Sequence, residues 1–362
     1  MNFTLRAQRN RLGLLVLVGA VILTALTLPR ALGAWWLNQA HSHIARALGA
    51  HDPGSRAALQ TAETQLEHAR ALSDDPHIAL ARARIALARN QAPRAAEELR
   101  ATGASWQDDF NAQFIWGNAE WQAGNATAAF EHWRAAGAFT YFINQAHRAA
   151  DQHAWQTAEQ FARMAIGIAP DNGDAHYALG DALAWQRTGD AEALRALTRA
   201  AELTRDPEKL ATILSRQGEV FAAQGDAANA QDFFERAIRV APLDARPRTG
   251  IAKLWLRADA EARAVALLTQ VIGDSPWYLD AYVTLAQIAE RHGEVAAAEQ
   301  WFAAGLAKNP NNPDLLFLLG EFYTRQNRAE QARQTLSLAL KFEPHADDAQ
   351  SIQRALQKLG ER

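Results

Sequence analysis

Residues 311–344 read NNPDLLFLLGEFYTRQNRAEQARQTLSLALKFEP, and the pattern inside this stretch decides the fold. A small residue, Gly320, is followed by Ala332, by the large apolar Leu336 and by Pro344. The same order occurs three more times upstream, with equivalent positions 34 residues apart. The recurring sets are Gly218, Ala252, Ala286 and Gly320; Ala230, Ala264, Ala298 and Ala332; Phe234, Leu268, Phe302 and Leu336; and Pro242, Pro276, Pro310 and Pro344. A fixed period of this length predicts a repeat protein in which each unit packs mainly on its neighbours.

This order resembles the tetratricopeptide repeat pattern W-x2-L-G-x2-Y…A-x3-F…P. The best copy contains Leu319-Gly320, Tyr323, Ala332, Leu336 and Pro344. The resemblance implies an all-α, right-handed superhelical solenoid of antiparallel helix pairs. In such a pair, small residues let the two helices approach and large residues fill the space between them. Proline is expected just after the second helix, because it cannot continue one.

The repeat signal is sharpest over residues 211–344 and weakens toward the N-terminus. Trp116-Gly117 and Leu179-Gly180 open earlier, less regular copies. The predicted divisions are a helical connector or degenerate repeat at 37–75, the repeats at 76–344 and a C-terminal capping helix at 345–362. The capping helix is expected because Ile352, Leu356 and Leu359 fall on one helical face, which would cover the last repeat.

Residues 12–36 predict a transmembrane signal-anchor helix that follows a short tail at 1–11. The run from Leu12 to Pro29 is 18 residues without a charge, which is near the lower limit for spanning a bilayer. Trp35 and Trp36 suit the membrane interface. A cleaved signal peptide is the alternative, since a basic start and an apolar run fit it equally well. The apolar run is, however, longer than the hydrophobic region of most signal peptides.

The arginines around the apolar run predict the orientation of the anchor. Arg6, Arg9 and Arg11 precede the run, and basic residues tend to stay on the cytoplasmic side. The N-terminus is therefore expected in the cytoplasm and the repeats on the non-cytoplasmic side of the membrane.

Composition excludes several classes of function. Residues 1–36 hold four arginines and no acidic residue, so the rest of the chain has a formal charge of −7, which argues against nucleic-acid binding. Cysteine is absent, which removes disulfides, thiolate metal sites and cysteine nucleophiles. No phosphate-binding glycine loop, G-x-S-x-G or H-E-x-x-H motif occurs. We therefore expect no enzyme, no cofactor and no metal site.

The family resemblance also implies a binding surface. In tetratricopeptide proteins the first helix of each pair lines a concave groove. The residues of this chain at the matching inward positions are Phe114, Asn118, Trp121, His147, Tyr177, Asp181, Trp185, Lys253 and Arg257. Exposed aromatic side chains on such a wall suit an apolar or extended peptide. The family's carboxylate-gripping mode is not expected, because Asp181 and Glu219 precede Lys253 and Arg257. Alternatively, Trp121 and Trp185 pack between the helices of irregular units.

These observations predict a membrane-anchored interaction protein rather than a catalyst. Its partners would be membrane or envelope proteins, and its role that of a scaffold, an assembly factor or an accessory subunit of a membrane complex. The alternative is an accessory protein of an envelope polysaccharide or lipid export system.

Overall fold

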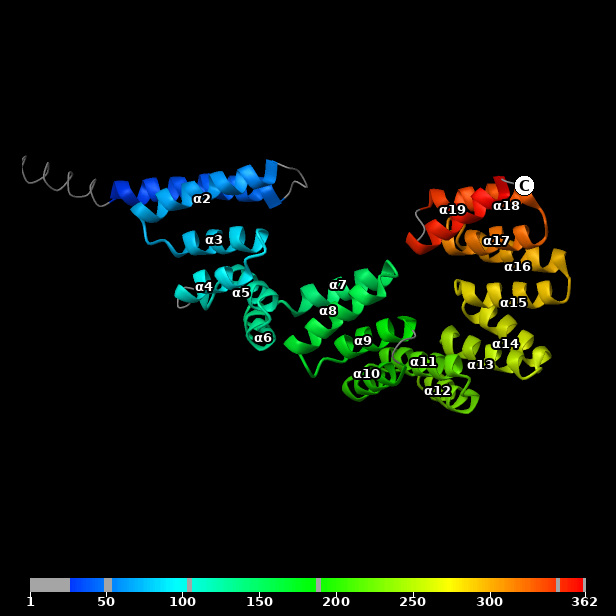
Figure 1. Cartoon of the computed structure of the whole chain (residues 1–362). Coiled ribbons are helices and arrows are strands. Elements are labelled where there is room, and N and C mark those ends of the chain that lie inside the picture. Colours follow the sequence, from blue (N-terminus) through cyan, green and yellow to red (C-terminus); the bar gives the residue numbers. More distant parts are fainter. Residues whose placement is uncertain (1–26, 49–53, 103–105, 187–189, 343–345, 361–362) are drawn as a thin grey trace, which may run out of the picture. The chain divides into compact units, whose positions relative to one another are not determined.

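The computed structural model describes residues 27–48, 54–102, 106–186, 190–342 and 346–360. The chain divides into two compact units between Phe139 and Thr140, here called the N-terminal and C-terminal units. Both are built from helices (Figure 1), and no strand occurs among the described residues. The prediction of an all-helical solenoid is confirmed, while its handedness stays a prediction.

Six helices make up the described part of the N-terminal unit. They are a helix over 27–48, α2 (Gly54–Leu72), α3 (Pro76–Ala88), α4 (Ala92–Ala101), α5 (Phe110–Gln122) and α6 (Ala126–Ala135).

The C-terminal unit continues with successive helices that pack against one another (Figure 1). They are α7 (Phe139–Asp151), α8 (Trp155–Ile168), α9 (Gly173–Gln186), α10 (Asp190–Leu203), α11 (Pro207–Gln224), α12 (Ala227–Val240), α13 (Ala245–Arg257), α14 (Glu261–Asp274), α15 (Leu279–Arg291), α16 (Val295–Lys308), α17 (Pro313–Arg325), α18 (Ala329–Lys341) and α19 (Ala346–Gly360).

Each turn between the two helices of a regular pair contains one residue in the left-handed conformation. Gly225, Asp259, Gly293 and Asn327 occupy this place, with φ of 84°, 54°, 73° and 58°. Glycine, asparagine and aspartate tolerate positive φ best, so the chain reverses here at little cost. These residues are also 34 positions apart, so the backbone repeats with the sequence.

The predicted helix-ending prolines lie where expected. α12, α14 and α16 end at Val240, Asp274 and Lys308, each two residues before Pro242, Pro276 or Pro310. Pro344 lies outside the described residues.

The small and large residues of the repeat pattern meet between the paired helices, as predicted. A Cβ added at Gly218 would lie 2.7 Å from the Phe234 ring, and one at Gly320 would lie 2.6 Å from Leu336. In the middle pairs, Ala252 shares a buried cluster with Leu268, and Ala286 shares one with Phe302. The close approach of each pair therefore depends on a small residue opposite a large one.

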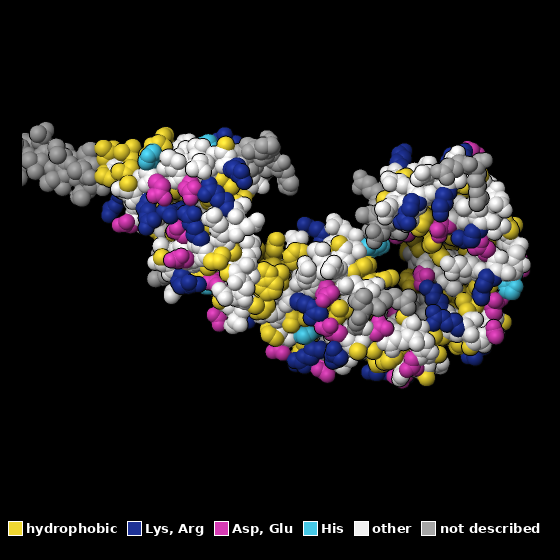
Figure 2. Space-filling view, in the orientation of Figure 1, with side chains coloured by type: hydrophobic (Ala, Val, Ile, Leu, Met, Phe, Trp, Pro, Cys, Tyr) yellow, Lys and Arg dark blue, Asp and Glu magenta, His cyan; other side chains and the backbone are white. Residues whose placement is uncertain are grey.

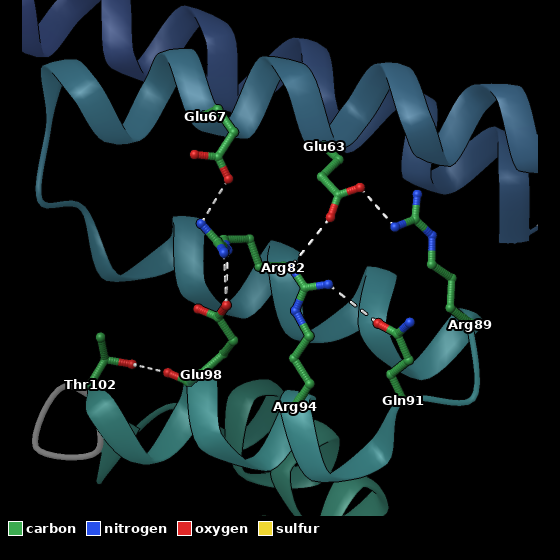
Figure 3. A network of polar contacts seen from close by, with 8 residues as sticks. All are labelled: Glu63, Glu67, Arg82, Arg89, Gln91, Arg94, Glu98 and Thr102. Carbon is green, nitrogen blue, oxygen red and sulfur yellow. Dashed lines mark hydrogen bonds and ion pairs between the residues drawn. The ribbon is translucent and has the colours of Figure 1, made fainter.

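Ion pairs tie α2 to the next two helices (Figure 3). The Arg82 guanidinium on α3 donates to Glu67 of α2 and to Glu98 of α4, at 3.0 Å in both cases. Glu63 of α2 accepts from Arg89 at 2.7 Å and from Arg94 at 3.3 Å. These contacts attach α2 to the first regular helix pair by electrostatics as well as by packing.

The helix over 27–48 overlaps the predicted membrane span. Among the described residues, no helix is both long and apolar enough to cross a bilayer, and residues 12–26 of the predicted span lie outside them. The helix runs past residue 36, and its Leu37 and Ile44 are buried against α2 and α3. Trp36, which the sequence assigned to the span, instead packs on His68 of α2, with ring centroids 4.7 Å apart. This corrects the C-terminal end of the span, because an apolar α2 face covers that side of the helix.

The last helix, α19, lies on the end of the solenoid. Its Ile352 and Leu359 are buried together with Leu336 and Ala339 of α18. The apolar surface of the final pair is thereby covered.

Candidate functional site

The predicted groove residues of the N-terminal unit lie on α5, and two of them serve helix packing. The Asn118 side-chain oxygen accepts a hydrogen bond from the Trp133 indole at 3.1 Å. The Trp121 ring lies 5.6 Å from that of Trp133 and is 37% exposed. Phe114 is half-buried. Asn118 and Trp121 therefore contribute to the contact between α5 and α6.

The remaining predicted residues belong to the C-terminal unit, and the structure brings three of them to one cavity. Trp185 of α9 and Lys253 and Arg257 of α13 line a cavity of about 390 Å³, here called the central cavity. Glu219 and Ala222 of α11 and Tyr278 and Asp280 at the start of α15 complete much of its wall. The cavity thus lies on the first helices of successive pairs, which contact one another in the order α9, α11, α13, α15.

Two other predicted residues line a neighbouring cavity. His147 of α7 and Tyr177 of α9 face a space of about 440 Å³, together with Asp174, Lys209 and Thr212. The Lys209 ammonium already pairs with Asp174 at 2.7 Å. Burial raises the pKa of Tyr177 to about 12, so its hydroxyl stays protonated at neutral pH.

Asp181 is held by an arginine that the sequence analysis did not name. The Arg216 guanidinium of α11 lies 2.7 Å from Asp181 and 2.6 Å from Glu219. Burial raises the pKa of the Asp181 carboxyl, and the charge of Arg216 opposes that rise. Asp181 is therefore engaged within the protein.

Trp185 both packs between helices and remains accessible. Its ring stacks on that of Trp155, with centroids 5.2 Å apart, and the Arg216 guanidinium carbon lies 4.5 Å from its centroid. His153 stacks in turn on Trp155 at 5.3 Å. The Trp185 side chain is still 53% exposed. The two sequence-based interpretations of this residue, packing and groove wall, are thus compatible.

The two predicted cations of the central cavity have partners within the chain. The Lys253 ammonium pairs with Asp280 at 2.7 Å, and Arg257 donates to the Ala222 carbonyl at 2.7 Å. A third cation, Arg246, lines the same cavity. Sequence reasoning missed it, although it precedes Lys253 by seven residues, or two helical turns, and so shares its face.

The surface of the molecule carries charges of both signs. Lys and Arg side chains alternate with Asp and Glu over the face shown in Figure 2. Among the described residues, no group of three or more histidine or acidic side chains has the arrangement needed to hold a metal ion.

Comparisons with known proteins identify the repeats. Tetratricopeptide repeat family models match residues 279–322 and 302–356. A solved tetratricopeptide repeat protein from Parabacteroides merdae is similar in fold, with a TM-score of 0.50 and 16% identity over 70% of this chain and 99% of that one. Pseudomonas aeruginosa pilF matches 60% of this chain and 98% of its own at 17% identity, with a TM-score of only 0.40. The predicted tetratricopeptide repeats are therefore confirmed.

One curated relative is similar in sequence. "Cellulose synthase 1 operon protein C" of Komagataeibacter xylinus is 30% identical over 136 residues, which cover 34% of this chain and 10% of that protein. The chain thus spans about a tenth of the length of this relative.

Proposed function

We propose that this tetratricopeptide repeat protein is a scaffold that holds a protein partner on the first helices of its C-terminal unit. One observation carries the proposal: the central cavity joins an exposed Trp185 to charged side chains from three further helices. Tryptophan and arginine in a partly enclosed site are the residues that contribute most to protein binding energy. Stacked repeats offer an extended surface of this kind.

Photo-crosslinking from the cavity tests this proposal. A benzoylphenylalanine placed at Trp185 should crosslink a protein partner in intact cells. The matched control is Leu338, which is 40% exposed and lies on a second helix, α18. Crosslinks from Trp185 and not from Leu338 support a partner on this face. Equal crosslinking from both positions, or none from either, contradicts it.

The scaffold is further proposed to be held at a membrane by residues 12–36, with the repeats on the non-cytoplasmic side. The support is the uncharged run after Arg6, Arg9 and Arg11. A deletion of residues 1–26 retains Trp36 and its packing on α2, so the units can still fold. The full chain should stay in the membrane fraction after alkaline extraction, and the deleted chain should be released. Release of the full chain would contradict the anchor.

A second candidate is an accessory role in envelope polysaccharide export. The observation that favours it is the relative from a cellulose synthase operon, at 30% identity over 136 residues. Loss of this protein should then reduce exported polysaccharide while synthesis of its precursor continues. An unchanged amount of exported polysaccharide would remove this candidate and leave the scaffold proposal standing.

A further inference from the structure

Arg246 is the charged side chain of the central cavity that lacks a partner in the chain. Among the described residues, its guanidinium makes no hydrogen bond or ion pair, although the side chain is half-buried. Burial alone would lower its pKa, but the electrostatic influence of Tyr177, Glu219 and Tyr278 raises it, so the group is fully charged. A half-buried guanidinium without an acceptor has lost part of its hydration without replacement.

The other charges of the cavity are already engaged. Lys253 pairs with Asp280, and Glu219 pairs with Arg216. Arg257 donates to a backbone carbonyl of α11. Three cations and two carboxylates line the cavity, so its wall is positive in a chain whose formal net charge is −3. A carboxylate that enters would find Arg246 uncompensated.

The rest of the wall is suited to an extended peptide. Ala222, Ala223 and Leu254 give it an apolar floor beside Trp185. A volume of about 390 Å³ has room for a few side chains and not for a folded domain. The Trp185 ring is stacked on Trp155 and lies near Arg216, so less of its face is open to a sugar ring.

We propose that the central cavity binds an extended acidic segment of the protein partner, with a carboxylate on Arg246 and a neighbouring apolar side chain against Trp185 and Leu254. This inference rests on the proposed scaffold function and names the chemistry of its partner. A guanidinium and a carboxylate form strong charge-assisted hydrogen bonds, and arginine is the side chain best shaped for them.

Synthetic peptides on the full-length chain in detergent test the proposal. Three labelled twelve-residue peptides share alternating leucines and differ in the other positions, which are Asp and Glu, Asn and Gln, or Lys. Fluorescence anisotropy should show the acidic peptide binding about tenfold tighter than the amide peptide, and less tightly at high salt. Arg246→Gln should abolish this preference. The control Arg195→Gln, which removes an exposed guanidinium on α10, should keep it.

The variants separate loss of binding from loss of folding. Arg246→Lys keeps the charge and should retain part of the acidic preference, and far-ultraviolet circular dichroism should show that all variants are folded. Equal affinity for acidic and amide peptides, or a preference that survives Arg246→Gln, overturns the proposal. Binding of an oligogalacturonate in place of every peptide overturns it in favour of an anionic polysaccharide. If Trp185 crosslinks a protein while the peptides show no acidic preference, this inference fails and the scaffold proposal stands.

Discussion

The indole rings of Trp155 and Trp185 are stacked, with centroids 5.2 Å apart and planes inclined by 14°. Trp155 begins α8 and Trp185 lies near the end of α9, so the contact joins two successive helix pairs. Arg216 of α11 lies over Trp185 and brings in a third pair. One stack of planar groups therefore connects the irregular start of the C-terminal unit to its regular repeats.

This stack predicts a measurable coupling between the two tryptophans. Trp155→Ala and Trp185→Ala, made singly and together, should give a coupling free energy of about 0.5–1.5 kcal/mol in urea unfolding. Trp277→Ala is the control, because Trp277 is 74% exposed and makes no ring contact among the described residues. It should change stability by less than about 0.5 kcal/mol. Additive effects of Trp155→Ala and Trp185→Ala would show that the stack contributes no coupling.

Glycine-to-alanine substitutions should have opposite signs at two helical positions. At Gly320 the new Cβ would meet the buried Leu336 side chain at 2.6 Å, so Gly320→Ala should destabilise the last pair by about 1–3 kcal/mol. At Gly273 nothing lies within 4 Å, so Gly273→Ala should stabilise by about 0.5–1 kcal/mol through helix propensity. Hydrogen exchange should place the loss at Gly320 within 313–341. Stabilisation by both changes would contradict the close packing.

Acid should remove stability that depends on Glu120. Burial would raise the pKa of this carboxyl, but hydrogen bonds from Asn125, Trp116 and Arg100 outweigh it and hold the pKa below its ordinary value of 4.5. A lowered folded-state pKa stabilises the fold above the unfolded value, and that stability is lost as pH falls through the folded-state value. Glu120→Gln should therefore cost stability near neutral pH and progressively less at acid pH. A cost that does not vary with pH would contradict this assignment.

The ion pairs of Figure 3 should differ in value according to exposure. Arg82 is only 13% exposed and serves two carboxylates, so Arg82→Gln should destabilise the N-terminal unit by about 1–3 kcal/mol. Glu67 is 58% exposed, so Glu67→Gln should cost less than about 1 kcal/mol. Denaturant unfolding of the two variants measures both. Equal effects would mean that burial does not decide the strength of these pairs.

The regular helix pairs could be predicted from sequence because their packing demands a small residue at one fixed place. Gly320 and Leu336 must meet, and no other spacing lets them do so in two antiparallel helices. The left-handed turn residues Gly225, Asp259, Gly293 and Asn327 follow the same period and were a signal that the prediction left unused.

The partners of polar side chains could not be predicted in the same way. Asn118 looks like a groove residue by position, yet it binds the Trp133 indole across the pair. Lys253 pairs with Asp280, a residue of the next pair, and Arg246 has no such neighbour. These differences depend on rotamers and on the approach of the next helix, which a repeat pattern does not specify. The irregular register around His153, where a histidine adopts a φ of 55°, adds to the difficulty.

The recurrence of one left-handed residue in every regular turn has a consequence for how this protein can change over evolution. A segment cut between equivalent turn residues, such as 226–259, carries one second helix and the next first helix. Duplicating or deleting that segment in the gene creates only junctions of a kind that the chain already contains. The protein can therefore grow or shrink by whole modules, and each added module supplies one more first helix to the face that a partner would occupy.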